Sequence, residues 1–141
     1  MKTRLVRVSI KTETMRLLYK DLTDQILKAF FKVYNELGYG FLEKVYENAL
    51  AYELSLMGMD VQKQYPIKVY YKDKKVGEYF ADILVDDTII LELKATPIKE
   101  MHEFQLLHYL KATDIELGLL LSFGKEARFV RKIFENRYKE K

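Results

Sequence analysis

The sequence has no cysteine and only two histidines, His102 and His108, among its 141 residues. The absence of cysteine excludes disulfide bonds, thiolate nucleophiles, iron–sulfur clusters and cysteine-based zinc sites. Two histidines cannot complete a three-histidine metal site, so any bound metal is expected to be a hard cation held mainly by carboxylates. None of the three serines lies in the pattern of a nucleophile elbow, which argues against a serine hydrolase.

Long apolar runs are also missing from the chain. No stretch approaches the roughly 18 apolar residues of a membrane-spanning helix, and the first 14 residues have no apolar core of a secretory signal. Together with the lack of cysteine, this pattern predicts a cytoplasmic protein that does not act in a membrane. The 24 Lys and Arg residues exceed the 21 Asp and Glu residues by three. That mildly basic balance permits nucleic-acid binding without requiring it.

The length and the absence of linkers predict a single domain over residues 1–141. Apolar residues recur first at helical spacing, then at strand spacing, and the short polar gaps between the first strands predict antiparallel hairpins. The predicted helices cover about residues 22–37, 41–57 and 99–113, and the predicted strands cover residues 61–71, 76–85, 88–95 and 117–123.

Two segments have ambiguous patterns. Residues 1–14 fit either an edge strand or a loose N-terminal extension, and residues 128–134 fit a helix slightly better than a strand. The order is therefore α-α-β-β-β-α-β, followed by one more strand or helix. This order predicts an α/β sandwich with a mixed sheet and a right-handed crossover through the third helix.

Charged residues stand in the middle of two predicted strands. Glu92 and Lys94 share one face of the strand over residues 88–95, because side chains alternate along a strand. Asp82 interrupts the apolar run of the preceding strand, where aspartate is disfavoured. A simpler interpretation is that Glu92 and Lys94 pair with each other where the strand leaves the core.

A turn of three residues, or of two plus a bulge, between these strands would bring Asp82 opposite Glu92, with Cβ atoms about 5 Å apart. Like charges at that distance destabilise a sheet unless a divalent cation lies between them. Mg²⁺ accepts one or two carboxylates and completes its shell with water and phosphate oxygens. The alternative is that Asp82 lies at a bulge and binds the backbone.

The second predicted helix carries further carboxylates. Glu43 falls within the apolar arc of this helix and Glu47 at its edge, so we expect Glu43, more than Glu47, to face the pair of strand carboxylates. Glu43 could instead compensate the charge of the helix N-terminus. Glu53 lies about 15 Å further along the axis, too far to join the same site, and is interpreted as part of a structural ion pair.

The third predicted helix places Gln105 and Tyr109 on one face, at positions i and i+4. This face is either part of the site or simply exposed to solvent.

At these residues the sequence resembles a known family. Gly40-x-x-Glu43-x-x-Tyr46 resembles the signature of the GxxExxY proteins, which are assigned to the PD-(D/E)xK nuclease superfamily. The resemblance extends from about Leu18 to Phe123, and Gln105-x-x-x-Tyr109 is similar to the helix motif of RecB-like nucleases. It implies a restriction-endonuclease-like αβββαβ core, with a mixed central sheet flanked by helices.

The resemblance also implies roles for individual residues. Asp82, Glu92 and the carbonyl of Leu93 would hold Mg²⁺ or Mn²⁺, and Lys94 would orient or deprotonate the attacking water. Glu43 would complete the acidic cluster, whereas Gln105 and Tyr109 would position the substrate strand. One departure is Ala81, which stands where the motif has proline, a residue that the chemistry does not need.

The predicted function is metal-dependent hydrolysis of nucleic acid, with DNA favoured over RNA. The rival class is a non-catalytic module that binds nucleic acid or a partner and keeps the nuclease fold. The intact Asp82, Glu92 and Lys94 argue against that class. A third class is a structural protein, because 11 tyrosines and 8 phenylalanines could form the surface of a homo-oligomer.

Overall fold

The computed structural model describes the backbone of residues 2–139 and, among their side chains, those of residue 16 and residues 19–139. Met1, Glu140 and Lys141, which belong to the predicted domain, lie outside the described residues. The elements in chain order are α1 (Lys2–Leu37), α2 (Glu43–Leu56), β1 (Val61–Tyr71), β2 (Lys74–Val85), β3 (Ile89–Lys94), α3 (Glu100–Lys111), β4 (Leu117–Phe123), β5 (Ala127–Ile133) and the short 3-10 helix η1 (Asn136–Tyr138).

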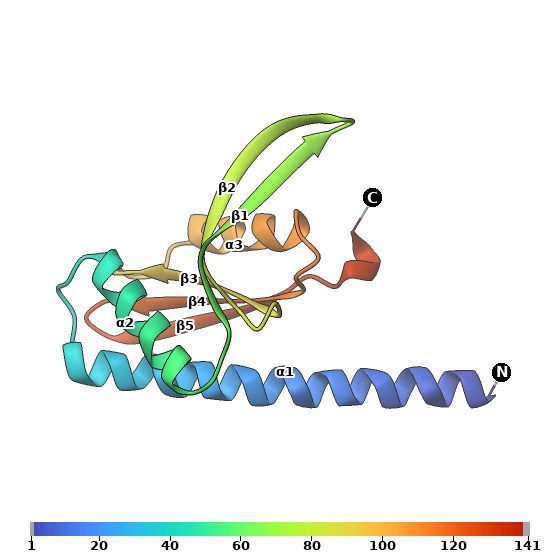
Figure 1. The fold of residues 1–141 in the computed structure, drawn as a ribbon, viewed down its shortest axis with the longest axis horizontal. Coiled ribbons are helices and arrows are strands. Elements are labelled where there is room, and N and C mark those ends of the chain that lie inside the picture. The colour runs from blue at the N-terminus through green and yellow to red at the C-terminus, as the bar shows by residue number, and fades with distance from the viewer. Residues whose placement is uncertain (1, 140–141) are drawn as a thin grey trace.

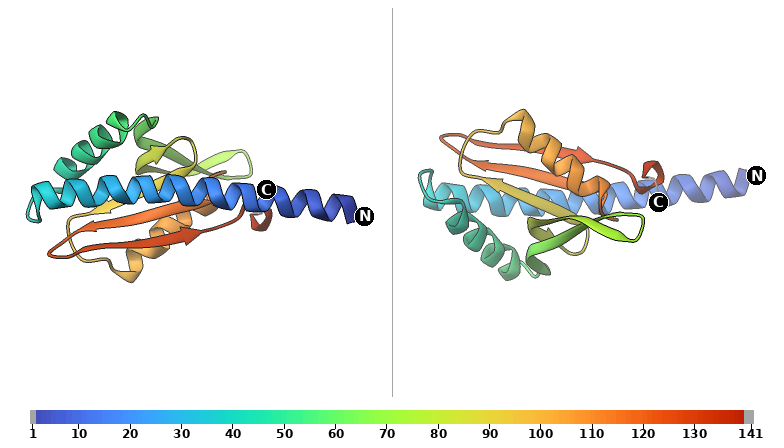
Figure 2. Two further views of the ribbon diagram at one scale, coloured as in Figure 1. Left: turned by 90° about the horizontal axis from the view of Figure 1, so that it is seen from below. Right: turned by 90° about the horizontal axis from the view of Figure 1, so that it is seen from above.

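The strands form one sheet in the order β1-β2-β3-β4-β5. β3 and β4 are parallel, and the other neighbouring pairs are antiparallel. Helix α3 connects the two parallel strands and covers one face of the sheet, whereas α1 and α2 lie on the opposite face (Figures 1 and 2). The mixed sheet flanked by helices confirms the predicted α/β fold.

The larger core lies between the sheet and the pair α1 and α2. It forms because the odd-numbered residues of β3 and β4 point to this face, opposite the apolar stripe of α1 around Phe30. Aromatic rings close one end of this core. Phe30 meets Phe123 edge-on at 4.8 Å between ring centroids, and Tyr46 of α2 stacks on Phe123 at 4.3 Å.

The smaller core lies under α3, where Leu106, Tyr109 and Leu110 pack on the even-numbered residues of β3 and β4. Gly118 of β4 permits this close approach. A Cβ atom at this position would lie 2.6 Å from Cδ1 of the fully buried Leu106. The side chains that follow Ile90 along the same face of β3 are Glu92 and Lys94, so these two candidate site residues lie on the α3 side.

The structure corrects the two ambiguous segments. Residues 2–14 form neither an edge strand nor a loose extension, because α1 is continuous from Lys2 and extends well past the sheet (Figure 1). Residues 127–133 form the strand β5 rather than the favoured helix. β5 has apolar side chains on both faces, because Phe129 meets Phe31 of α1 and Val130 packs under α3. Within residues 2–139, no helix is both long and apolar enough to cross a membrane.

The link between α1 and α2 is organised by Tyr46. Gly38 adopts a φ of 69° and Gly40 a φ of 107°, conformations that favour glycine, and they turn the chain sharply after α1. The hydroxyl of Tyr46 donates to the carbonyl of Gly38 at 2.7 Å and accepts from the N–H of Phe41 at 3.2 Å. These bonds fix the direction in which α2 starts, and therefore where its first carboxylates lie.

Candidate active site

The candidate site begins where β2 and β3 separate. Their ladder runs from Val85 opposite Ile89 to Ile83 opposite Leu91, which brings Asp82 opposite Glu92, in the register that the sequence predicts. Beyond this point, hydrogen bonds from backbone N–H groups to carboxylate side chains replace the hydrogen bonds between the two backbones. The N–H of Asp82 donates to Glu92 Oε1 at 2.9 Å, and the N–H of Leu93 donates to Asp82 Oδ2 at 2.8 Å. Asp82 therefore does bind the backbone, as the alternative interpretation held, while remaining beside Glu92.

Burial gives the two carboxylates unusual electrostatics. Glu92 is only 4% exposed. Burial is the largest cause that raises the pKa of Glu92 to about 8, and the charge of Asp82 is the next. The hydrogen bond from the Asp82 N–H and the charge of Lys94 lower this pKa by less. Burial likewise raises the pKa of Asp82, although the bond from the Leu93 N–H lowers it. Two carboxylates in this environment resist being charged together at neutral pH unless a cation compensates them.

Lys94 supplies the positive charge nearest along the strand. It is half-buried at the end of β3, opposite Ser122 of β4, and its charge favours the ionised forms of both Asp82 and Glu92. Because Glu92 and Lys94 lie two residues apart on one strand face, both side chains can reach one ligand on the α3 side of the sheet.

The carboxylates of α2 correct one prediction. Glu43 is exposed, whereas Glu47 is 4% exposed, so the expectation that Glu43 lies deeper is wrong. Glu43 does share the stripe of Glu47 and Leu50, but it lies in the first turn of α2, where no element covers it. Its charge nevertheless raises the pKa of both Asp82 and Glu92, so it lies near the site.

Glu47 is held in place from two sides. Its Oε1 accepts from Gln64 Nε2 at 2.7 Å, and its Oε2 pairs with Lys44 Nζ at 2.7 Å. The charge of Glu47 raises the pKa of Asp82, more strongly than that of Glu43 does. Glu53, by contrast, pairs with Lys32 of α1 at 2.8 Å, which confirms its interpretation as a structural ion pair.

Helix α3 covers the site with Tyr109. The Nε2 of the exposed Gln105 donates to the hydroxyl of Tyr109 at 2.9 Å. Burial and, next, the charge of Glu92 raise the pKa of Tyr109 to about 12, so this ring lies close to the strand carboxylates. Gln105 lies at the rim of the site and Tyr109 lies inside it.

Three more residues near the site were given no role by sequence reasoning. Gln64 has a φ of 54°, between two regular β1–β2 pairs that flank Asp82, and it holds Glu47. His102 accepts the N–H of Lys99 at 3.0 Å, and its pKa is lowered by burial and then by the charge of Lys94. The ring of Tyr79 lies 6.2 Å from that of Tyr109. Only tertiary packing brings Gln64 and Tyr79 to the site, so no spacing in the sequence indicated them, whereas His102 lies three residues before Gln105 on the same helix.

The donor set fits a hard divalent cation. Among the described residues, no group of three or more Asp, Glu or His side chains is arranged to hold a metal. Asp82 and Glu92 nevertheless place a half-buried and a buried carboxylate side by side, and the charge of Lys94 offsets the rise in their pKa values only in part. Mg²⁺ needs only one or two carboxylates when water and substrate oxygens supply its other ligands.

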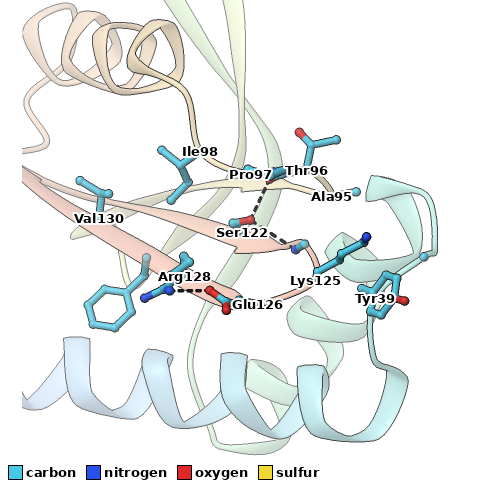
Figure 3. A pocket seen from close by; sticks show the side chains of 13 residues that line it. Tyr39, Ala95, Thr96, Pro97, Ile98, Ser122, Lys125, Glu126, Arg128 and Val130 are labelled. Carbon is cyan, nitrogen blue, oxygen red and sulfur yellow. Dashed lines mark hydrogen bonds and ion pairs between the residues drawn. The ribbon is translucent and has the colours of Figure 1, made fainter.

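A cavity of about 910 Å³ adjoins the end of β3. Ala95, which directly follows Lys94, lines this cavity. Lys125 and Arg128 of the β4–β5 hairpin line it as well (Figure 3). Ser122 closes its wall by donating to the carbonyl of Thr96 at 2.7 Å. Arg128 is paired with Glu126, also in the wall. The cavity gives an extended ligand room beside the candidate site.

Residues 20–133 match the family model described as PD-(D/E)XK nuclease superfamily. The match includes every residue assigned above to the candidate site. No curated protein and no solved structure matches the chain.

Proposed function

Because the chain belongs to the PD-(D/E)XK nuclease superfamily, we propose that it is a metal-dependent nuclease that hydrolyses phosphodiester bonds in nucleic acid, DNA in preference to RNA. The observation that carries this proposal is the pairing of Asp82 with Glu92 at the separation of β2 and β3. A buried and a half-buried carboxylate, both with raised pKa values, destabilise a sheet unless they serve a function. The Gly40, Glu43 and Tyr46 signature further supports assignment to the GxxExxY proteins.

The cofactor in this proposal is Mg²⁺ or Mn²⁺, held by Asp82, Glu92 and the carbonyl of Leu93. Such a cation would stabilise the charge that develops on the phosphoryl oxygens and favour ionisation of the attacking water. Phosphoryl transfer otherwise depends on positioning, so the remaining task of the chain is to hold the reacting groups in place.

Several residues around the cation would share the task of holding the reacting groups in place. Lys94 orients the attacking water or accepts its proton while the bond from phosphorus to the leaving oxygen breaks. The carboxylates of Glu43 and Glu47 add negative charge beside Asp82, which strengthens the attraction for a divalent cation. Gln105 and Tyr109 contact the substrate strand from α3.

The decisive experiment is a cleavage assay with single- and double-stranded DNA and RNA, in Mg²⁺, Mn²⁺ or EDTA. Wild type should cleave only with metal, and Lys94→Ala should not cleave. Lys28→Ala is the matched control, because Lys28 is an exposed lysine of α1, in the layer on the far side of the sheet. Binding of nucleic acid without cleavage under any of these conditions would instead support a non-catalytic module.

A further inference from the structure

The β1–β2 hairpin extends beyond the rest of the domain as an arm, which we define as residues 66–80. Its tip rises past α3, on the side of the sheet away from α1 (Figure 1). Ile67 anchors its base in the core under α3. Residues 68–78 are exposed, apart from the half-buried Val69 and Gly77, so the distal arm has no packing role in the domain.

Large aromatic side chains lie on this exposed arm. Tyr70 is 57% exposed and Tyr71 is 66% exposed, and Tyr79 and Phe80 are also exposed. Apolar patches of this kind on a projecting element mark an interaction surface, because they gain nothing from the core of their own domain.

The arm also carries most of the excess positive charge of the chain. Its four lysines outnumber its two acids by two, against an excess of three for all 141 residues. Lys75 pairs with Glu78, but Lys72 and Lys74 form no ion pair with any residue in the described part of the chain. Lys72 lies over the ring of Tyr71, 5.6 Å from its centroid. The surface therefore suits a partner with both negative charge and flat apolar groups.

The exposed rings continue towards the candidate active site. Tyr79 pairs with the buried Ile67 and so lies on the face of the hairpin that meets α3. Its ring lies edge-on to His108 at 5.2 Å and 6.2 Å from Tyr109, whose pKa responds to the charge of Glu92. The arm and the carboxylates are thus connected by adjoining aromatic side chains.

One more ring of the arm lies on the same face. The register shifts between Val69 and Tyr70, which leaves Val76 as an extra residue in β2. Side chains still alternate along the unbulged β1, so Tyr71 lies on the face of Ile67 and Val69, which leads to α3.

We propose that this arm binds an unpaired stretch of the nucleic acid whose cleavage is proposed above, and so directs a single strand to Asp82 and Glu92. Bases that are not paired expose their faces for stacking on Tyr70, Tyr71 and Tyr79, whereas a duplex hides them. Lys72 and Lys74 contact the phosphates of the same strand. The inference rests on the proposed function for its ligand.

The test measures binding of a fluorescein-labelled 20-nucleotide single strand of mixed sequence, and of the same strand annealed to its complement, by anisotropy in EDTA. The arm variants are Tyr70→Ala/Tyr71→Ala and Lys72→Gln/Lys74→Gln. Matched controls are Tyr52→Ala, a tyrosine of α2 that is 67% exposed, and Lys20→Gln on α1. All variants are compared by circular dichroism and thermal melting to show that they are folded.

The tyrosine pair should weaken single-strand binding at least tenfold and duplex binding less than threefold, while both controls bind like wild type. The lysine pair should weaken single-strand binding and reduce its dependence on salt. Unchanged single-strand binding in the folded tyrosine variant would overturn the inference. So would equal losses for duplex and single strand, or an arm variant that only converts a dimer of this chain to a monomer in sedimentation.

The same proteins separate the two proposals. Wild type that cleaves with metal, beside arm variants that still bind the single strand normally, refutes the arm and leaves the nuclease intact. Wild type that binds the single strand through the arm but never cleaves refutes the nuclease and leaves the arm intact.

Discussion

The backbone N–H of Asp82 donates to the carboxylate of Glu92 at 2.9 Å, at the point where β2 and β3 stop pairing through their backbones. The bond holds Glu92 in a buried position beside a second acid and by itself lowers the pKa of Glu92, whereas burial and the charge of Asp82 raise it. Burial and the charges of Glu47 and Glu43 raise the pKa of Asp82. The site thus holds two acids in a fixed geometry in which their ionisation is unfavourable. A bound cation would make their ionised forms favourable.

Metal affinity should therefore depend on pH. The pKa of Glu92, raised to about 8 from an ordinary value of 4.5, means that a proton occupies this carboxyl at neutral pH. Mn²⁺ must displace that proton, so its affinity should rise up to tenfold per pH unit and level off above about pH 8. Calorimetric titration with Mn²⁺ from pH 6 to 9 measures this. Glu92→Gln should bind weakly with little pH dependence; a wild-type affinity that is flat with pH would contradict the prediction.

The stability of the metal-free protein should change in the opposite direction. Between pH 4.5 and about 8, the folded protein keeps a proton on Glu92 that the unfolded chain releases. The free energy of unfolding should therefore fall as the pH rises through this interval. Mg²⁺ should recover part of the loss at pH 8, as seen in thermal melts with and without the metal. Stability that rises over the same interval in EDTA would show that Glu92 is ionised in the folded state.

Asp82→Asn and Glu92→Gln should each reduce cleavage more than 100-fold, about 2.7 kcal/mol of transition-state stabilisation. Both amides keep an oxygen that accepts the backbone bonds from Leu93 and Asp82, but they remove the charge that a cation needs. In EDTA above about pH 8, where Glu92 of the wild type is ionised, the variants should melt at or above the wild-type temperature, because one of two repelling carboxylates is gone. Melting far below wild type would show that the carboxylate holds the fold.

Glu47→Gln should reduce kcat/KM about tenfold and Glu43→Gln less than threefold. Glu47 is buried and held by Gln64 and Lys44, so its charge acts on Asp82 from a fixed position. Glu43 is exposed, and solvent screens it. Cleavage rates for both variants, measured over a series of Mg²⁺ concentrations, compare the two. A larger loss for Glu43→Gln would restore the assignment that the sequence favoured.

Gly118→Ala should destabilise the protein by about 1–3 kcal/mol, because its Cβ would lie 2.6 Å from a buried atom of Leu106. Denaturant unfolding measures the change. The double variant Leu106→Ala/Gly118→Ala should lose less than the sum of the two single changes, because the smaller side chain removes the clash. Additive losses would place the effect of Gly118 elsewhere.

The sequence was sufficient where one physical pattern dominated a segment. β4 is buried along all seven residues, and its apolar run predicted both of its ends. The register that sets Asp82 opposite Glu92 followed from the length of the turn at Asp86 and Asp87. Such features depend on neighbouring residues along the chain, so local rules can find them.

Prediction failed where packing from distant elements decided the outcome. β5 lies at an edge of the sheet with α1 and α3 on its two faces, so its apolar residues do not alternate with polar ones. Their spacing in the sequence therefore resembles that of a helix. The first predicted helix begins at about residue 22, but α1 already begins at Lys2. Glu43 lies on the side of α2 that carries core residues. It is exposed because no other element covers the first turn of this helix.

The hydrogen bonds of Tyr46 lie in the link between α1 and α2 and not among the strand carboxylates. The signature that identifies the sequence is therefore distinct from the residues proposed for its chemistry. Tyr46 stacks on Phe123, and its hydroxyl joins Gly38 to Phe41 across Gly40, which has a φ of 107°. Gly40 and Tyr46 of the signature therefore shape a corner of the architecture. Substitutions at Asp82 or Glu92, which would abolish the proposed hydrolysis, would leave that corner undisturbed. A sequence search that depends on the signature therefore tests for the corner, and the strand carboxylates have to be checked separately.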